Sequence, residues 1–154
     1  MSDPLRDIVE VIEAETLPHA YMRALFAYWQ AARGDAAAPL VTALDPLKLP
    51  REALPYLGIL DVEGDPPKFR TRLMGTRFVE ASGEDLTGRL VDELPGIEPQ
   101  LVRFRWAVEH RRPYFVSSPL TWSDKDFIRY DALGLPFVDH RGAVARLVFV
   151  FGFS

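Results

Sequence analysis

Apolar side chains at the start of the chain recur at the spacing of one helical face, and they are Leu5, Ile8, Val9 and Ile12. Asp3 is a favourable N-cap for such a helix. Pro4 suits its first position, because the N–H that proline lacks would have no helical partner there. The pattern therefore predicts a helix that begins at residue 4.

A second helix is predicted from Pro18 to Arg33, and Gly34 supplies its C-terminal stop. Its apolar stripe consists of Tyr21, Ala24, Leu25, Tyr28 and Trp29. Two alternatives are open for what the apolar stripes of the two N-terminal helices contact. The helices fold back on a sheet of their own chain, or they pack against a second copy in an isologous dimer.

Residues 35–55 are punctuated by four prolines and are predicted to be a linker with short turns. The period then changes from helical to strand-like. Leu57 to Val62 is predicted to be a strand, and residues 64–67 are predicted to form a turn. Lys68 to Met74 alternates apolar and polar side chains, so it is predicted to pair back as a hairpin.

Residues 76–112 are helix-prone, and the segment 83–89 breaks them into short pieces. The strongest helical pattern there runs from Leu101 to Arg112 and ends before Pro113. Three strands are predicted after it, over 114–118, 127–138 and 144–153. The last strand is apolar from Leu147 to Phe153 except at Gly152, so it must be central and covered on both faces.

This order of elements predicts an α+β fold with a five-stranded antiparallel sheet. Short helices would cover one face of the sheet and the N-terminal helices would cover the other. We expect three parts: an N-terminal helical cap or dimerisation segment over residues 1–34, the linker over 35–55 and the core over 56–154.

Composition narrows the function classes. A chain of 154 residues is one ordinary domain. It has no cysteine, which excludes disulfides, thiolate metal sites, a thiol nucleophile and a cysteine-linked flavin. The net charge of −4 argues against a nucleic-acid partner. Neither a membrane span nor a signal peptide is recognisable, so we expect a cytoplasmic protein with no membrane partner.

The order of two strands, a helical block and three strands resembles the PAS domain. The stretch Gly83–Arg89 is similar to the turn that ends the first short helices of PAS domains. More narrowly, the chain resembles an alphaproteobacterial PAS-like family of small, often stand-alone proteins over about residues 20–152. The matching pieces are Tyr28-Trp29, Asp45–Pro50, Leu54–Leu57, Leu60–Val62, Phe69–Thr76, Arg112-Pro113 and Leu133–Pro136.

The resemblance implies a stand-alone bacterial sensory or regulatory domain without catalytic activity. Such a domain binds a small molecule in its core, signals by interaction with a partner protein, or does both. The resemblance also favours a homodimer, because sensory PAS modules often pair through the N-terminal helix. The implied pocket wall is Leu73, Phe78, Trp106, Phe115 and Phe149. The implied dimer or partner surface is Leu5, Ile8, Val9, Ile12, Tyr21, Leu25 and Tyr28.

Two alternatives stay open. The first is a ligand-free dimeric interaction module with a filled core, because close packing is the default state of protein interiors. The second is a small α+β enzyme with an acid/base pocket, which requires a buried Asp–His or Asp–Arg pair. The pair that the sequence offers for this role is His110 with Asp85 or Asp92.

The candidate cofactor and charge sites are few. Haem-binding PAS domains ligate iron from a histidine on the helix that holds His110, whereas a cationic side chain near a helix C-terminus needs no ligand to explain it. His19 and His140 lack a second ligand at helical or strand spacing, so no metal site is predicted. A basic cluster could bind phosphate or an acidic partner, although a solvated helix face explains it more simply; it consists of Arg103, Arg105, Arg111 and Arg112.

Overall fold

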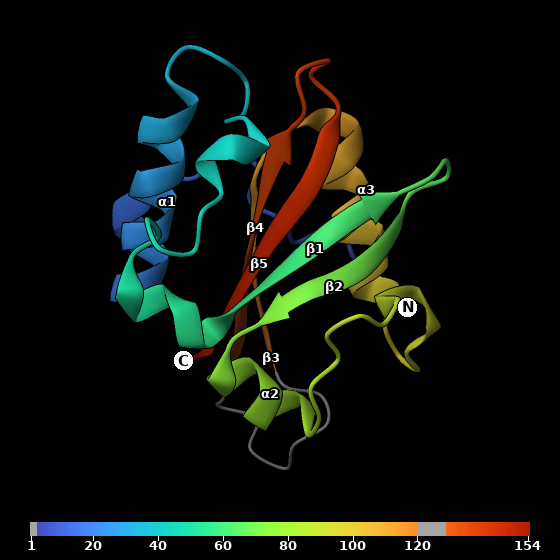
Figure 1. Cartoon of the computed structure of the whole chain (residues 1–154). Coiled ribbons are helices and arrows are strands. Elements are labelled where there is room, and N and C mark those ends of the chain that lie inside the picture. The colour runs from blue at the N-terminus through green and yellow to red at the C-terminus, as the bar shows by residue number, and fades with distance from the viewer. Residues whose placement is uncertain (1–2, 120–128) are drawn as a thin grey trace.

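Five antiparallel strands form one sheet in the computed structural model of the chain, which describes residues 3–119 and 129–154 (Figure 1). The strands are β1 (Leu57–Glu63), β2 (Lys68–Met74), β3 (Tyr114–Pro119), β4 (Arg129–Val138) and β5 (Val144–Phe153), in the order β2-β1-β5-β4-β3. The predicted α+β class is confirmed. Residues 127 and 128, predicted to begin the fourth strand, lie outside the described residues.

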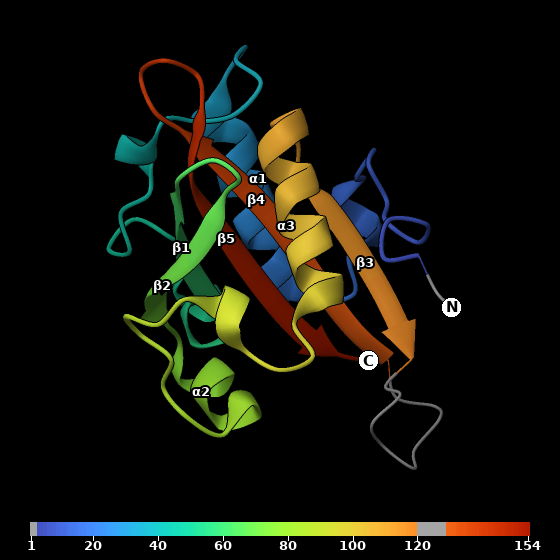
Figure 2. The same ribbon diagram turned by 90° about the vertical axis from the view of Figure 1, so that its right-hand side faces the viewer.

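Helices cover both faces of the sheet. Figure 2 shows α3 (Glu98–His110) in front of the sheet and α1 (Ala20–Arg33) behind it. The short helix α2 (Thr76–Ser82) lies at one end of the sheet, directly after β2. Short 3-10 helices connect these elements, and they are η1 (Ala14–Thr16), η2 (Val41–Ala43), η3 (Arg51–Tyr56) and η4 (Val91–Glu93).

The sheet divides the apolar core into two clusters. The outer cluster, between the sheet and α1, contains Leu17, Met22, Leu25, Phe26, Trp29, Ala38, Leu44, Leu49, Ala53, Leu57, Ile59, Leu133, Leu135, Phe137, Val138, Val144, Val148 and Val150. The inner cluster, between the sheet and α3, contains Leu60, Phe69, Val91, Leu101, Phe104, Trp106, Ala107, Tyr114, Val116, Ala132, Leu147, Phe149 and Phe151. Residues of β5 alternate between the two clusters, which confirms that this central strand is covered on both faces.

The prediction of a helix from residue 4 is wrong. Residues 4–13 contain no helix, and Val9 instead pairs with Phe115 at the outer edge of β3. The Val9 N–H donates to the Phe115 carbonyl at 2.7 Å, and the Phe115 N–H donates to the Val9 carbonyl at 3.1 Å. A helix of two or three turns is marginal by itself, and an open sheet edge offers unpaired backbone groups to the same residues.

Apart from Val9, which is 43% exposed, the apolar residues predicted to form a dimer surface pack on their own chain. Leu5 and Ile8 lie against the inner cluster, and Ile12 lies against the outer cluster. Leu25 is only 1% exposed, so it is not available to a second copy in this arrangement. The buried face of α1 shares only Leu25 and Trp29 with the predicted stripe. It consists of Met22, Leu25, Phe26 and Trp29.

The two tyrosines of that predicted surface also have partners within the chain. The Tyr21 hydroxyl donates to the Phe151 carbonyl at 2.8 Å, and the Tyr28 hydroxyl donates to the Ala43 carbonyl at 2.6 Å. The segment 35–55 packs under α1 as well, because four of its apolar side chains belong to the outer cluster: Ala38, Leu44, Leu49 and Ala53.

Tyr114 generates a test of the inner cluster. Its side chain is fully buried, and a Cβ atom at Gly134 would collide with its ring. Within the described residues its hydroxyl has no hydrogen-bond partner. A buried unsatisfied polar group costs about 1–3 kcal/mol. Tyr114→Phe is therefore expected to leave the free energy of unfolding unchanged or to raise it, measured by urea denaturation.

Tyr28→Phe is the matched control, because it removes a hydroxyl that does have an acceptor, the Ala43 carbonyl. We expect it to lower the free energy of unfolding by about 1 kcal/mol. A loss for Tyr114→Phe as large as that for Tyr28→Phe would contradict the assignment of an unsatisfied hydroxyl.

Candidate functional site

A cavity of about 240 Å³ lies on the inner side of the sheet. The strands supply its floor, with Gly58, Leu60, Thr71, Met74, Tyr130 and Phe149. The cover comes from α2, the segment around η4 and the start of α3, with Phe78, Ser82, Leu86, Val91, Leu94, Pro95, Gly96, Ile97, Gln100 and Phe104. It is thus enclosed by segments that are distant in the sequence and that the fold brings together.

The cavity exists because few side chains fill the space between its floor and its cover. Gly58 presents no side chain from β1, and a Cβ atom there would approach the Phe78 ring to 3.2 Å. The cover helix α2 has no buried residue of its own. Dense packing is therefore not achieved here, unlike the outer cluster under α1.

The lining chemistry is mainly apolar. Its polar side chains are Thr71, Ser82, Gln100 and Tyr130, and the described lining residues include no charged side chain. Burial raises the pKa of Tyr130, so this hydroxyl stays protonated at neutral pH. A charged ligand would lose its hydration here without gaining an opposite charge. The cavity therefore suits a neutral, mainly apolar molecule.

Of the five residues predicted to form the pocket wall, the structure places Phe78 and Phe149 on the cavity. Their rings lie 5.6 Å apart between centroids. Trp106 is buried in the same layer, but it is not among the residues that line the cavity.

Leu73 does not line the cavity, contrary to the expectation. Ile59 pairs with Leu73 whereas Leu60 pairs with Thr71, so β2 contains one extra residue, Arg72, between those pairs. Such a bulge reverses the alternation of side chains beyond it. Thr71 therefore faces the cavity, and Leu73 packs against the outer cluster.

Phe115 also lies on the other face. Its neighbours in β3, Tyr114 and Val116, belong to the inner cluster, and side chains of a strand alternate between faces. Phe115 therefore packs against the outer cluster, next to the N-terminal segment that pairs with it.

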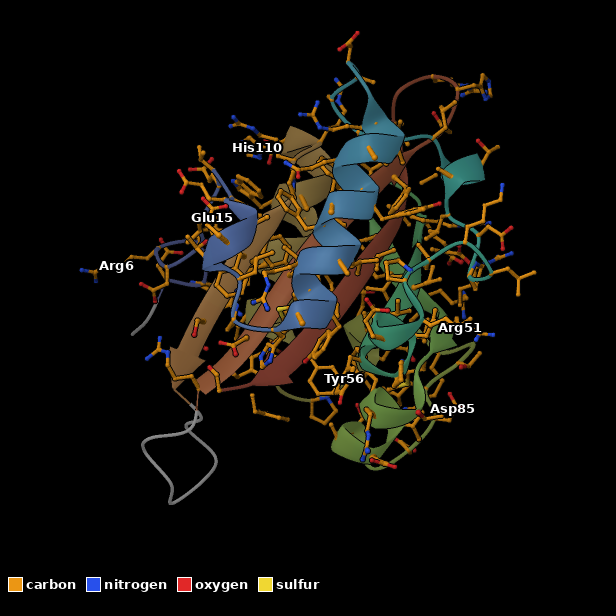
Figure 3. The ribbon with its side chains drawn as sticks, turned by 90° about the vertical axis from the view of Figure 1, so that its left-hand side faces the viewer. Arg6, Glu15, Arg51, Tyr56, Asp85 and His110 are labelled. Carbon is orange, nitrogen blue, oxygen red and sulfur yellow. The ribbon has the colours of Figure 1, made fainter. Side chains whose placement is uncertain are left out.

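His110 does not reach the cavity. It is the last residue of α3, its ring stacks on Trp106 with centroids 4.7 Å apart, and its Nδ1 lies 2.9 Å from the Trp106 carbonyl oxygen. The side chain is on the surface beside α1 (Figure 3). The lining residues of the cavity therefore do not fit haem, since none of those described is a histidine.

A buried polar pair that sequence reasoning missed lies on the outer face of the sheet. His19, directly before α1, places its Nε2 2.9 Å from an oxygen of Asp131, a β4 residue that is fully buried. Ser117 on β3 donates to the other carboxylate oxygen at 2.7 Å. Gly152, opposite Asp131 on β5, makes room for the pair, because a Cβ atom there would collide with His19 and Tyr21.

This arrangement is an anchor for α1 and not a catalytic triad. Ser117 donates to Asp131 and has no hydrogen bond with His19, so the Ser117 hydroxyl is not placed for activation by the imidazole. The His19 ring instead stacks on Tyr21 at 5.1 Å, and Tyr21 stacks on Tyr56 at 4.1 Å. The signal in the sequence was an aspartate within a buried strand and a lone glycine in an otherwise apolar one.

Metal ligands and membrane spans complete the inventory of sites. In residues 3–119 and 129–154, no group of three or more His, Asp or Glu side chains could hold a metal ion. Within the same ranges, no helix has both the length and the apolar character that a membrane crossing requires.

The chain is similar to one known family and to two solved structures. The family model described as PAS domain matches residues 17–110 of the chain. The solved PAS domain of histidine kinase ThkA is 14% identical with a TM-score of 0.48, and the match covers 62% of this chain and 97% of that one. An RNA-binding Light-Oxygen-Voltage receptor is 16% identical with a TM-score of 0.45, and the match covers 72% of this chain and 33% of that one.

The family match extends over more than half of the chain, so the chain belongs to the PAS domain family. No curated protein sequence matches it. Members of this family are sensory or regulatory modules, in general without catalytic activity.

The anchor at Asp131 generates a stability prediction. Asp131→Ala removes the acceptor of both His19 and Ser117 inside the protein. Leaving a buried donor without its acceptor costs about 1–3 kcal/mol. We expect a loss of this size in the free energy of unfolding, measured by urea denaturation.

Glu80→Ala is the control, because it breaks the surface pair with Arg77; the side chains of Arg77 and Glu80 are 60% and 65% exposed. Exposed pairs contribute at most about 1 kcal/mol. Equal effects of Glu80→Ala and Asp131→Ala would show that Asp131 is not an anchor.

Proposed function

We propose that this PAS domain is a sensor of a small, neutral, mainly apolar molecule that binds in the inner cavity. The observation that carries the proposal is the lining: apolar side chains with four polar ones and, among the described residues, no charge. Binding sites for small molecules typically combine an apolar lining with a few polar groups that orient the ligand. Thr71, Gln100 and Tyr130 are suited to that orienting role.

The volume sets the size of the ligand. An engineered cavity of about 150 Å³ holds benzene, and sites for drug-sized ligands have about 300–1,000 Å³. A cavity of about 240 Å³ lies between these values. It fits a bicyclic aromatic molecule such as indole, which also carries one N–H donor for a polar lining group.

Occupancy would act through the cover. Phe78 of α2 contacts both Phe149 and Phe151 of the central strand, with ring centroids 5.6 and 5.0 Å apart. A ligand beneath Phe78 therefore competes with these ring contacts. It can shift the protein between two states only if it binds one of them more tightly, and the lightly packed α2 is the element most easily displaced.

The further expectations from the resemblance are part of the same proposal. They are a cytoplasmic location, a bacterial source, a homodimer, and an output that changes association with a partner signalling protein. The dimer surface has to differ from the predicted one at Leu25, which is buried under its own chain. The proposal also includes the absence of catalytic activity. The hydrogen bond that Ser117 donates to Asp131 supports it, because this hydroxyl is not positioned as a nucleophile.

Indole binding tests the proposal. Wild-type protein is expected to bind indole, detected by amide chemical shifts of cavity residues, and to bind the anion indole-3-acetate at least about tenfold more weakly, because the described lining of the cavity offers no cation. Ser82→Trp places a large side chain at the exposed rim of the cavity and is expected to weaken indole binding about tenfold.

Arg77→Trp is the matched control, because Arg77 is an exposed residue of the same helix that does not line the cavity. We expect its affinity for indole to stay at the wild-type value. Equal affinity for indole and indole-3-acetate, or equal effects of the two substitutions, would contradict the proposed site. A wild-type protein with no affinity for indole or for other neutral bicyclic molecules would favour the ligand-free interaction module.

A further inference from the structure

A groove of about 380 Å³ separates the C-terminal ends of α1 and α3, away from the inner cavity. Its floor is apolar and includes Ile12, Phe26, Trp29 and Pro113. Its rim carries Arg33, His110, Arg111 and Arg112, and its described lining residues include no acidic side chain. Figure 3 shows His110 at this end of the molecule, beside α1.

Helix dipoles explain only part of this charge. A cation at a helix C-terminus gains about 0.3–1 kcal/mol, and each of the two helices ends here. Three arginines around one groove repel each other, however. Arg112 meets Glu10 of the N-terminal segment at 3.7 Å, whereas Arg33 and Arg111 have no carboxylate within ion-pair distance in the described part of the chain.

Arg111 adds an independent observation. It is the C-cap of α3 with a φ of 55°, and within the described residues it is the one residue other than glycine with a positive φ. Glycine and asparagine are favoured at this position, because a side chain strains the left-handed conformation. Strain of this kind is concentrated at functional positions, and Arg111 is one of the residues that line the groove.

The arginines are spread along the groove and do not converge on one point. Arg33 lies over the Trp29 ring at 5.7 Å and donates to the Ala36 carbonyl at 2.9 Å. Arg111 donates to the Gly142 carbonyl at 3.3 Å. A single small anion could not contact all of these groups at once, whereas an extended segment with several carboxylates could.

We propose that this groove is a docking surface for an acidic peptide segment of a partner protein. Glu10, which does not line the groove, already brings a carboxylate oxygen to 3.7 Å from the guanidinium of Arg112 on the rim. The apolar floor would accept an aliphatic side chain between the acidic ones. Nucleic acid suits the groove less well, because Trp29 is only 3% exposed under Arg33 and offers no ring for stacking, and the chain has a net charge of −4.

Fluorescence anisotropy with a labelled octaglutamate peptide tests the proposal on the whole chain, with octaglutamine as the uncharged control. Octaglutamate is expected to bind, octaglutamine is not, and the affinity should fall as salt rises. Arg111→Gly is the decisive variant. It removes a groove charge and also relieves the strained backbone, so we expect unchanged or higher resistance to urea together with about three- to fivefold weaker binding.

Arg33→Gln should weaken binding to a similar extent, and it keeps the test valid if Arg111→Gly disturbs the end of α3. Arg77→Gln is the matched control, because it removes the same charge from an exposed position on α2. Equal losses for Arg77→Gln and Arg111→Gly, or binding of octaglutamine, would overturn the proposal. Displacement of the labelled octaglutamate by inorganic phosphate at a concentration equal to that of the peptide would also overturn it. So would tighter binding of a single-stranded RNA of equal length. None of these outcomes depends on indole binding in the inner cavity.

Discussion

The fold depends on the burial of β5 from both sides. From Leu147 to Phe151 this strand has no polar side chain, and its residues alternate between the outer and inner clusters. Each square ångström of apolar surface removed from water contributes about 25 cal/mol, so a strand of this kind is stable only between two layers. One layer is α1 with the segment that follows it, and the other is α3 with the cover of the cavity (Figures 1 and 2).

The outer and inner layers cover β5 in different ways: the outer layer is packed throughout, whereas the inner layer contains the proposed binding cavity. The outer layer is closed by dense packing and by one buried polar anchor, in which Gly152 admits His19 and Asp131 receives it. The inner layer is closed over Trp106 and Tyr114 but incompletely over Gly58, which leaves a cavity under Phe78. A PAS domain can respond to a ligand only where its packing has such a gap, because a fully packed layer has no second arrangement of similar energy.

The inner cavity and the groove at the ends of α1 and α3 also differ in charge. The described lining of the cavity is neutral, whereas the ends of α1 and α3 gather arginines around a groove next to the β3 edge. The N-terminal segment contacts the edge of the sheet and α3: Val9 pairs with Phe115, Glu10 meets Arg112 and the Pro4 carbonyl accepts a hydrogen bond from the buried Arg103. The two proposed binding surfaces therefore lie at opposite ends of α3 and use different chemistry.

The hydrophobic pattern and the turn residues of the sequence determined the class of fold, the hairpin of β1 and β2 and the central position of β5, because these depend on local patterns and on how much apolar surface a strand must bury. Only the tertiary structure decided three other features. A bulge at Arg72 places Leu73 on the face away from the cavity. Val9 pairs with the open edge of β3 and does not form a helix. His19 and Asp131, which are 112 positions apart, form a hydrogen bond because β4 packs against the start of α1. Each of these depends on contacts between distant residues, which sequence spacing does not record.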